Sequence, residues 1–96
     1  MLVGILRLEF WLHGNDSLKG KRRVALSLKQ KLRNKFNLSV AEIEAQDSHT
    51  RLVLGAAMAG SDWVNIERKL QNAVSMIEAI SPEELVDSDI DIIGTD

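Results

Sequence analysis

The spacing of apolar residues changes from segment to segment, and the order of these spacings restricts the possible folds most. Residues 2–13 have apolar side chains at every second position, which indicates a strand with one core face. Residues 17–36 have them at helical spacing instead, on a stripe of Ala25, Leu28, Leu32 and Phe36. Two strand patterns, a second helical pattern and a last strand pattern follow, at residues 38–46, 51–60, 62–80 and 84–93.

This β-α-β-β-α-β order predicts an α+β protein with a ferredoxin-like fold. Two right-handed crossovers joined by a hairpin give a four-stranded antiparallel sheet with both helices on one face. The 96 residues suit a single domain spanning 1–96. In this topology the first and third strands are central in the sheet.

The face of the sheet away from the helices is predicted to be apolar. It should carry Val3, Ile5 and Trp11 from the first strand and Val53 from the third. Apolar surface of this kind is unfavourable in water, so we expect a homodimer or larger assembly to cover it.

Several side-chain positions follow from the same patterns. Ser17 or Asp16 should cap the first helix, and Ser61 or Asp62 the second. One side of the second helix is predicted to be apolar, with Trp63, Ile66, Leu70, Ala73, Val74 and Ile77. Glu42 and Glu44 should share one strand face. In the last strand the alternation predicts one face for apolar residues and the other for acidic ones: Val86, Ile90 and Ile92 against Asp87, Asp89 and Asp91.

The strongest functional signal is a basic segment in an acidic protein. Residues 17–41 carry eight basic residues and no acidic one, whereas the whole chain has a net charge of −2. Four of the cations stand where the first helix begins: Lys19, Lys21, Arg22 and Arg23. The helix macrodipole disfavours cations there, and a bound anion would reverse this effect. We therefore predict an anion- or RNA-binding site formed by these four residues and extended by Lys29 and Arg33. A solvated basic face, or one that docks on acidic protein, is the alternative.

Catalytic and metal-binding motifs are not found in the sequence. Gly14 and Gly20-Lys21 resemble a P-loop, but the spacing is one residue too long and Arg22 stands where Ser or Thr would hold magnesium. His13 and His49 have no metal-ligand spacing, and there is no Cys. We predict a non-enzymatic protein with no cofactor and no metal site.

The location is predicted to be cytoplasmic. The absence of Cys is typical of a reducing compartment, and Arg7 and Glu9 interrupt the apolar N-terminal segment, which therefore does not resemble a signal peptide. No apolar run is long enough to cross a membrane.

Three segments resemble the YlxP-like proteins, small bacterial proteins of unknown function. They are "SLKGKRRV" after the first strand, "FNLSVAE" at the start of the hairpin, and the apolar strand that contains Gly55. The resemblance covers essentially the whole chain and implies a ferredoxin-like fold. The genes of this family often lie beside genes for translation initiation and ribosome maturation, which implies binding to the ribosome or rRNA. Family members commonly have a Trp in the hairpin, where this chain has Ser48-His49.

Three function classes remain open at this point. The first is a non-enzymatic RNA- or ribosome-associated module that contacts phosphate backbone through the basic helix. The second is a homo-oligomeric interaction or structural module whose basic helix docks on acidic protein. The third, small-molecule sensing at a dimer interface, is compatible with the fold but is not supported by particular residues.

Overall fold

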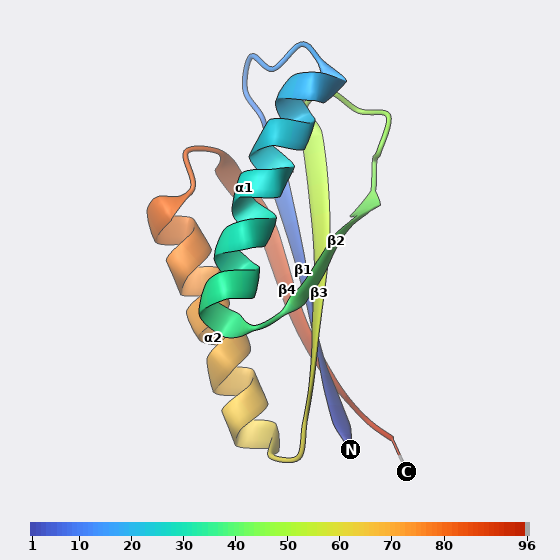
Figure 1. The fold of residues 1–96 in the computed structure, drawn as a ribbon, viewed down its shortest axis with the longest axis vertical. Helices are drawn as coiled ribbons and strands as arrows, with labels where there is room; N and C mark the ends of the chain where they lie inside the picture. The colour runs from blue at the N-terminus through green and yellow to red at the C-terminus, as the bar shows by residue number, and fades with distance from the viewer. Residues whose placement is uncertain (96) are drawn as a thin grey trace.

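The computed structural model describes residues 1–95 and has the predicted β-α-β-β-α-β order (Figure 1). The elements are β1 (Leu2–Trp11), α1 (Leu18–Phe36), β2 (Ser39–Glu44), β3 (Arg51–Gly60), α2 (Trp63–Ile80) and β4 (Glu84–Gly94). No helix in this part of the chain is long and apolar enough to cross a membrane.

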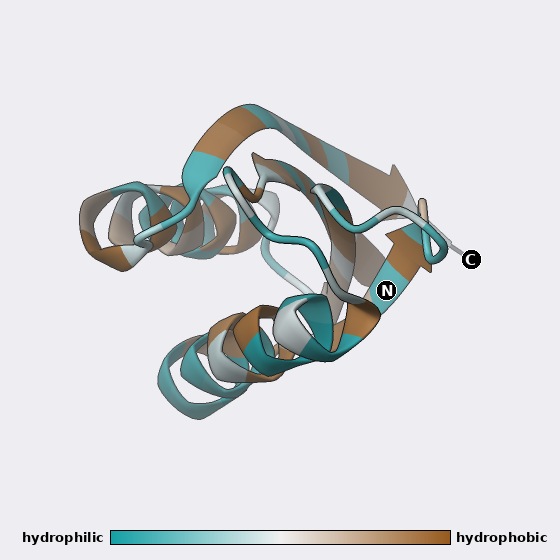
Figure 2. Ribbon diagram, turned by 90° about the horizontal axis from the view of Figure 1, so that it is seen from above, coloured by the Kyte–Doolittle hydropathy of each residue, from teal (hydrophilic) through white to brown (hydrophobic). Residues whose placement is uncertain are grey.

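The four strands form one antiparallel sheet in the order β2-β3-β1-β4. This order confirms that the first and third strands are central. Both helices lie on the same side of the sheet, and the other side is left open (Figure 2). The architecture is the predicted ferredoxin-like fold.

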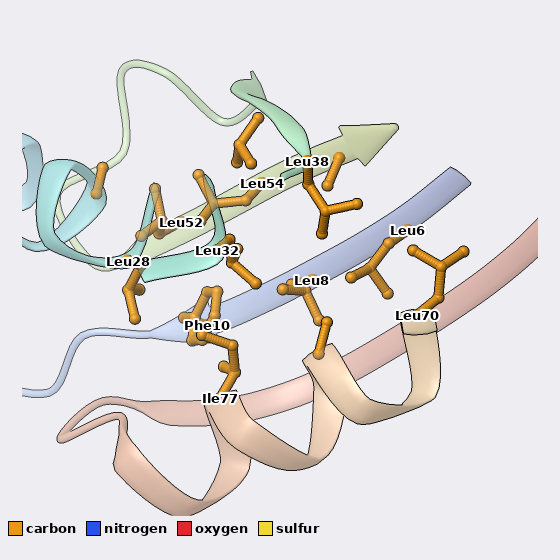
Figure 3. Packing of buried hydrophobic residues seen from close by; sticks show 14 of the residues in the cluster. Leu6, Leu8, Phe10, Leu28, Leu32, Leu38, Leu52, Leu54, Leu70 and Ile77 are labelled. Atoms are coloured by element: carbon orange, nitrogen blue, oxygen red, sulfur yellow. The ribbon is translucent and has the colours of Figure 1, made fainter. Parts of the chain in front are cut away.

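The core lies between the sheet and the helices (Figure 3). The even-numbered residues of β1 face this core, because the strand has a two-residue repeat. They meet the buried stripe of α1 and the corresponding stripe of α2, which contains Ile66, Leu70, Ala73 and Ile77. Trp63 was predicted to share the apolar side of this helix, but it does not belong to the buried stripe. It is the first residue of α2, and 48 % of it is exposed.

Two irregularities change which face of the sheet some residues occupy. The β2–β3 register shifts between Glu42 and Glu44, so these two residues lie on opposite faces, not on one face as predicted. The β1–β4 register shifts opposite Glu9 and Phe10. Leu85, rather than Val86, therefore packs against the core, and Val86 is exposed.

The helix ends follow from the local sequence. Ser17 caps α1 by accepting a hydrogen bond from the Gly20 N–H, and Asp62 caps α2 by accepting one from Val64. Asn37 ends α1 in the left-handed conformation, which is a common helix stop.

Candidate nucleic-acid interface

Helix α1 carries an extended basic surface. Its eight basic residues include only one that is buried, Lys21. The other seven are solvent-accessible: Lys19, Arg22, Arg23, Lys29, Lys31, Arg33 and Lys35. Within residues 1–95, no carboxylate lies close enough to form an ion pair with any of these seven. Their charge is therefore available to a partner.

The solvent-accessible cations occupy both flanks of α1. At 100° per residue, Arg22, Lys29 and Arg33 fall within about 40° of one another. Arg33 Nη2 donates a hydrogen bond to the Val40 carbonyl at 2.9 Å, which places this flank beside β2. This hydrogen bond uses one of the five N–H donors of the Arg33 guanidinium, and the other donors can contact a phosphate.

The prediction that Lys21 contacts a phosphate is contradicted by its burial. Only 1 % of Lys21 is exposed, and its ammonium group points into the turn between β2 and β3. Nζ donates to three carbonyl oxygens, at 2.8, 3.2 and 3.4 Å, which belong to Ala45, Gln46 and Arg51. Glu42 Oε2 lies 2.9 Å from Nζ as an ion pair, but the three carbonyls take the three Nζ donors. Lys21 is therefore a structural residue.

The segment before Lys21 also connects α1 to this turn. The Asn15 side-chain amide donates to the carbonyls of Ser17 and His49, so it bridges the start of α1 and the β2–β3 connection. A Cβ at Gly20 would collide with Asn15 Oδ1 and would lie 3.1 Å from Ser17 Oγ. Much of the "SLKGK" motif thus has a structural explanation, and the exposed part of the predicted cluster is Lys19, Arg22 and Arg23.

A groove of about 190 Å³ lies on the other flank of α1, where the helix approaches the turn after α2. Two of its lining residues are basic, Arg23 and Lys31. The others are Val24, Ser27, Leu28 and Pro82. The groove therefore combines a mainly apolar floor with two cations.

The open face of the sheet has a charged half and an apolar half. In the charged half, Glu9 accepts hydrogen bonds from Arg51 Nε at 2.7 Å and from Arg7 Nη2 at 3.1 Å. Arg7 Nε also donates to Glu44 at 2.7 Å. The Arg51 hydrogen bond, assisted by Arg7, lowers the pKa of the Glu9 carboxyl despite its partial desolvation. The hydrogen bond to Glu44, together with the one to Glu9, raises the pKa of the Arg7 guanidinium, and the hydrogen bond to Glu9 raises that of Arg51.

The assignment of Val53 to an exposed interface was wrong. Val53 has no exposed surface, although it lies outside the hydrophobic core. Its neighbours across the two strand pairs are Glu9 and Glu44, both held by Arg7. This ion-pair network stands on either side of Val53 and accounts for its burial.

The other predicted interface residues are accessible to different extents. Val3 and Ile5 are partly buried, and Trp11 is 48 % exposed. The apolar half of the face also contains Ile43 and Ile93, which the sequence patterns did not single out. A shallow hollow of about 370 Å³ lies between Ile5, Ile43 and the small residues of β2 and β3.

The aspartates of β4 and His13 lie at the surface. Asp87, Asp89 and Asp91 are exposed along the edge strand β4, and Asp87 lies 3.6 Å from Arg7. His13 Nε2 is 2.6 Å from Glu84 Oε1 at the surface. No group of potential ligands within residues 1–95 is arranged to hold a metal ion.

Comparison with known proteins identifies similar sequences. The profile of a family described as "Protein of unknown function (DUF503)" matches residues 3–90. The uncharacterized protein YlxP of Bacillus subtilis (strain 168) is 33 % identical over 78 residues, which cover 81 % of this chain and 85 % of that protein.

Solved structures with much lower sequence identity share the fold. The cofactor-independent oxygenase SnoaB of Streptomyces nogalater superposes with a TM-score of 0.53 at 13 % identity, over 99 % of this chain and 93 % of its own. The 30S ribosomal protein S6 of Thermotoga maritima does so with a TM-score of 0.50 at 12 % identity, over 95 % and 88 %. At these identities the likeness extends to the fold alone.

Proposed function

This chain belongs to the DUF503 family of proteins of unknown function, and we propose that it is a non-enzymatic RNA- or ribosome-associated module that contacts phosphate backbone through α1. The observation that carries the proposal is the set of seven accessible cations on one helix, none of which forms an ion pair with a carboxylate of residues 1–95. A basic surface of this kind is the electrostatic signature of nucleic-acid binding.

The extent of the basic surface favours a polymer over a single small anion. Lys19 and Lys35 are sixteen residues apart in α1, which corresponds to about 24 Å along the helix axis. Phosphates repeat along a nucleic-acid backbone, so a partner of this kind can meet several of the cations together. Asp87, Asp89 and Asp91 belong to the edge strand β4, whereas α1 packs over β2 and β3, so these three carboxylates would not repel such a partner strongly.

Binding of this kind has a defined salt dependence. If all seven cations neutralise phosphates of single-stranded RNA, a plot of log K against log salt concentration should have a slope of about −5. We expect the double substitution R22E/R23E to weaken binding by more than tenfold at low salt and to make this slope shallower. The measurement is fluorescence anisotropy of a labelled RNA, together with co-sedimentation with ribosomes in native lysate.

A matched control separates the site from the net charge of the protein. The double substitution R68E/K69E in α2 changes the net charge by the same amount on the other helix. Its affinity should stay close to that of the wild type. If R22E/R23E binds RNA and ribosomes as well as R68E/K69E does, α1 is not the RNA-binding surface and the proposal fails.

A second candidate function is a homo-oligomeric interaction module, in which the open face of the sheet joins two copies. The observation that favours it is the accessible apolar half of this face, which includes Ile43 and Ile93, both more than 40 % exposed. The substitution Ile93→Lys would then produce monomers in light scattering, whereas Val64→Lys on α2, which is also exposed, would not. A wild-type protein that is monomeric at high concentration would exclude this candidate.

A further inference from the structure

The groove beside α1 extends the proposed function, because its chemistry differs from that of a plain basic surface. Leu28 is buried in the core and Val24 packs against it, so the floor of the groove is fixed by the fold. Ser27 supplies one hydroxyl, and Pro82, from the turn after α2, also lines the groove. A ligand that fits this groove needs an apolar part and an anionic part.

The size of the groove restricts the apolar part. Its volume of about 190 Å³ is slightly larger than the cavity of roughly 150 Å³ that holds one benzene molecule in an engineered protein. A single six-membered ring therefore fits, and the two fused rings of a purine require more room.

The charges at the groove restrict the anionic part. Arg23 and Lys31 both line it and are eight residues apart, which corresponds to about 12 Å along α1. Both are exposed, and neither forms an ion pair within the described chain. The groove therefore has a cation on each side of an apolar surface. A matching ligand is a polymer in which anionic groups stand on both sides of a flat ring. Single-stranded RNA has this arrangement, because its unstacked bases can turn away from the backbone.

We propose that the groove binds one unstacked pyrimidine base of single-stranded RNA, with Arg23 and Lys31 contacting the phosphates on either side of it. Ser27 Oγ can donate to or accept from the polar edge of the base. This inference depends on the proposed function, and it assigns the base recognition to a site distinct from Arg22, Lys29 and Arg33. Those three cations would add affinity without base preference.

The test compares RNAs of equal charge on the unmodified protein. Fluorescence anisotropy would measure the Kd of a labelled oligo(U), of an oligo(A), and of an abasic oligoribonucleotide, all of the same length. We expect oligo(U) to bind about fivefold more tightly than the abasic chain, the low end of what stacking of one base on an aromatic side chain contributes, because this groove is lined by aliphatic side chains. Oligo(A) should bind more weakly than oligo(U). The salt slopes should agree, because all three chains carry the same phosphates.

A substitution at Ser27 fills the groove without changing its charge, and a matched substitution on α2 serves as the control. Ser27→Leu should abolish the preference for oligo(U) and leave the salt slope unchanged. Ser75→Leu makes the same change at an exposed position of α2 and should have no effect. If Ser27→Leu alters the far-UV spectrum, Val24→Phe fills the same groove from the neighbouring position.

The outcomes distinguish this inference from the proposed function. If the wild type binds all three RNAs equally, and R22E/R23E still abolishes binding, the base site is refuted while the RNA-binding surface stands. If oligo(U) binds Ser27→Leu as tightly as the wild type, the base site is also refuted. If none of the RNAs binds, both proposals fail. Binding of an acidic, phenylalanine-containing peptide in the same groove, without RNA binding, would overturn both in favour of a protein partner.

Discussion

The buried position of Lys21 leads to a prediction that separates its structural role from a phosphate-binding role. In Lys21→Met the aliphatic part of the side chain is kept and the ammonium group is lost. Three carbonyl oxygens then lose a donor, and the Glu42 carboxylate loses its ion-pair partner. We expect the substitution to destabilise the fold even though the residue stands in a basic surface motif.

The size of the effect can be worked out from these contacts. Removing one partner of a buried ion pair costs about 3–5 kcal/mol. The side chain of Glu42 is 22 % exposed, so water can reach part of its carboxylate and the lower figure applies, about 3 kcal/mol. For a chain of this length each kcal/mol lowers Tm by about 4–8 °C, which gives a decrease of at least about 12 °C.

The assay is urea unfolding followed by far-UV circular dichroism, with the free energy of unfolding taken by linear extrapolation. Lys19→Met removes an exposed cation from the same helix and should change stability by no more than about 0.5 kcal/mol. In Lys21→Met/Glu42→Gln the second change removes the unpaired charge and should restore about 1 kcal/mol. If Lys21→Met is as stable as Lys19→Met, the structural interpretation of Lys21 is wrong.

Three further predictions concern stability. Because hydrogen bonds from two guanidinium groups lower the pKa of Glu9, its contribution is full above the ordinary glutamate pKa of about 4.3 and is lost as the pH falls through the lower folded value. The stability difference between wild type and Glu9→Gln, measured by urea unfolding at several pH values, should therefore shrink as the solution is acidified below pH 4.3; a constant difference would contradict this. Gly4→Ala should lower Tm, because a Cβ there would collide with the Ile66 side chain; an unchanged Tm in a thermal melt would show that α2 moves away at no cost. Phe10→Ala should cost about 3–5 kcal/mol in urea unfolding, whereas Trp63→Ala should cost far less since Trp63 is half exposed, and similar costs would refute the assignment of the core.

The sequence allowed the fold to be predicted because each element has a regular apolar repeat. The alternation in β1 identified its core face correctly along the whole strand. Two of the errors, at Glu42 with Glu44 and at Val86, occur where a repeat is interrupted. A bulge adds one residue to a strand and moves the following side chains to the other face, and such a shift is not visible in the pattern of Val86 or Glu42.

The position of Lys21 could have been found from the sequence. It lies four residues before Ala25 and seven before Leu28, so it falls on the core stripe of α1. Its charge led us to group it with its exposed neighbours instead. The burial of Val53 had no such signal, because it depends on Arg7, Glu9 and Glu44 meeting across three strands. The groove beside Pro82 also depends on tertiary structure, since it forms where α1 approaches the turn after α2.

The strand order also has a consequence for how the chain folds during synthesis. β1 is made before the other three strands described here but pairs along one edge with the latest of the four, β4, and the Met1 backbone is hydrogen-bonded to Thr95. Pairing of such distant segments is slow because a long loop must close first. Until β4 has left the ribosome, β1 retains an unpaired edge that a second nascent chain can join. Protection of the β1 edge, and completion of the four-stranded sheet, therefore depend on β4.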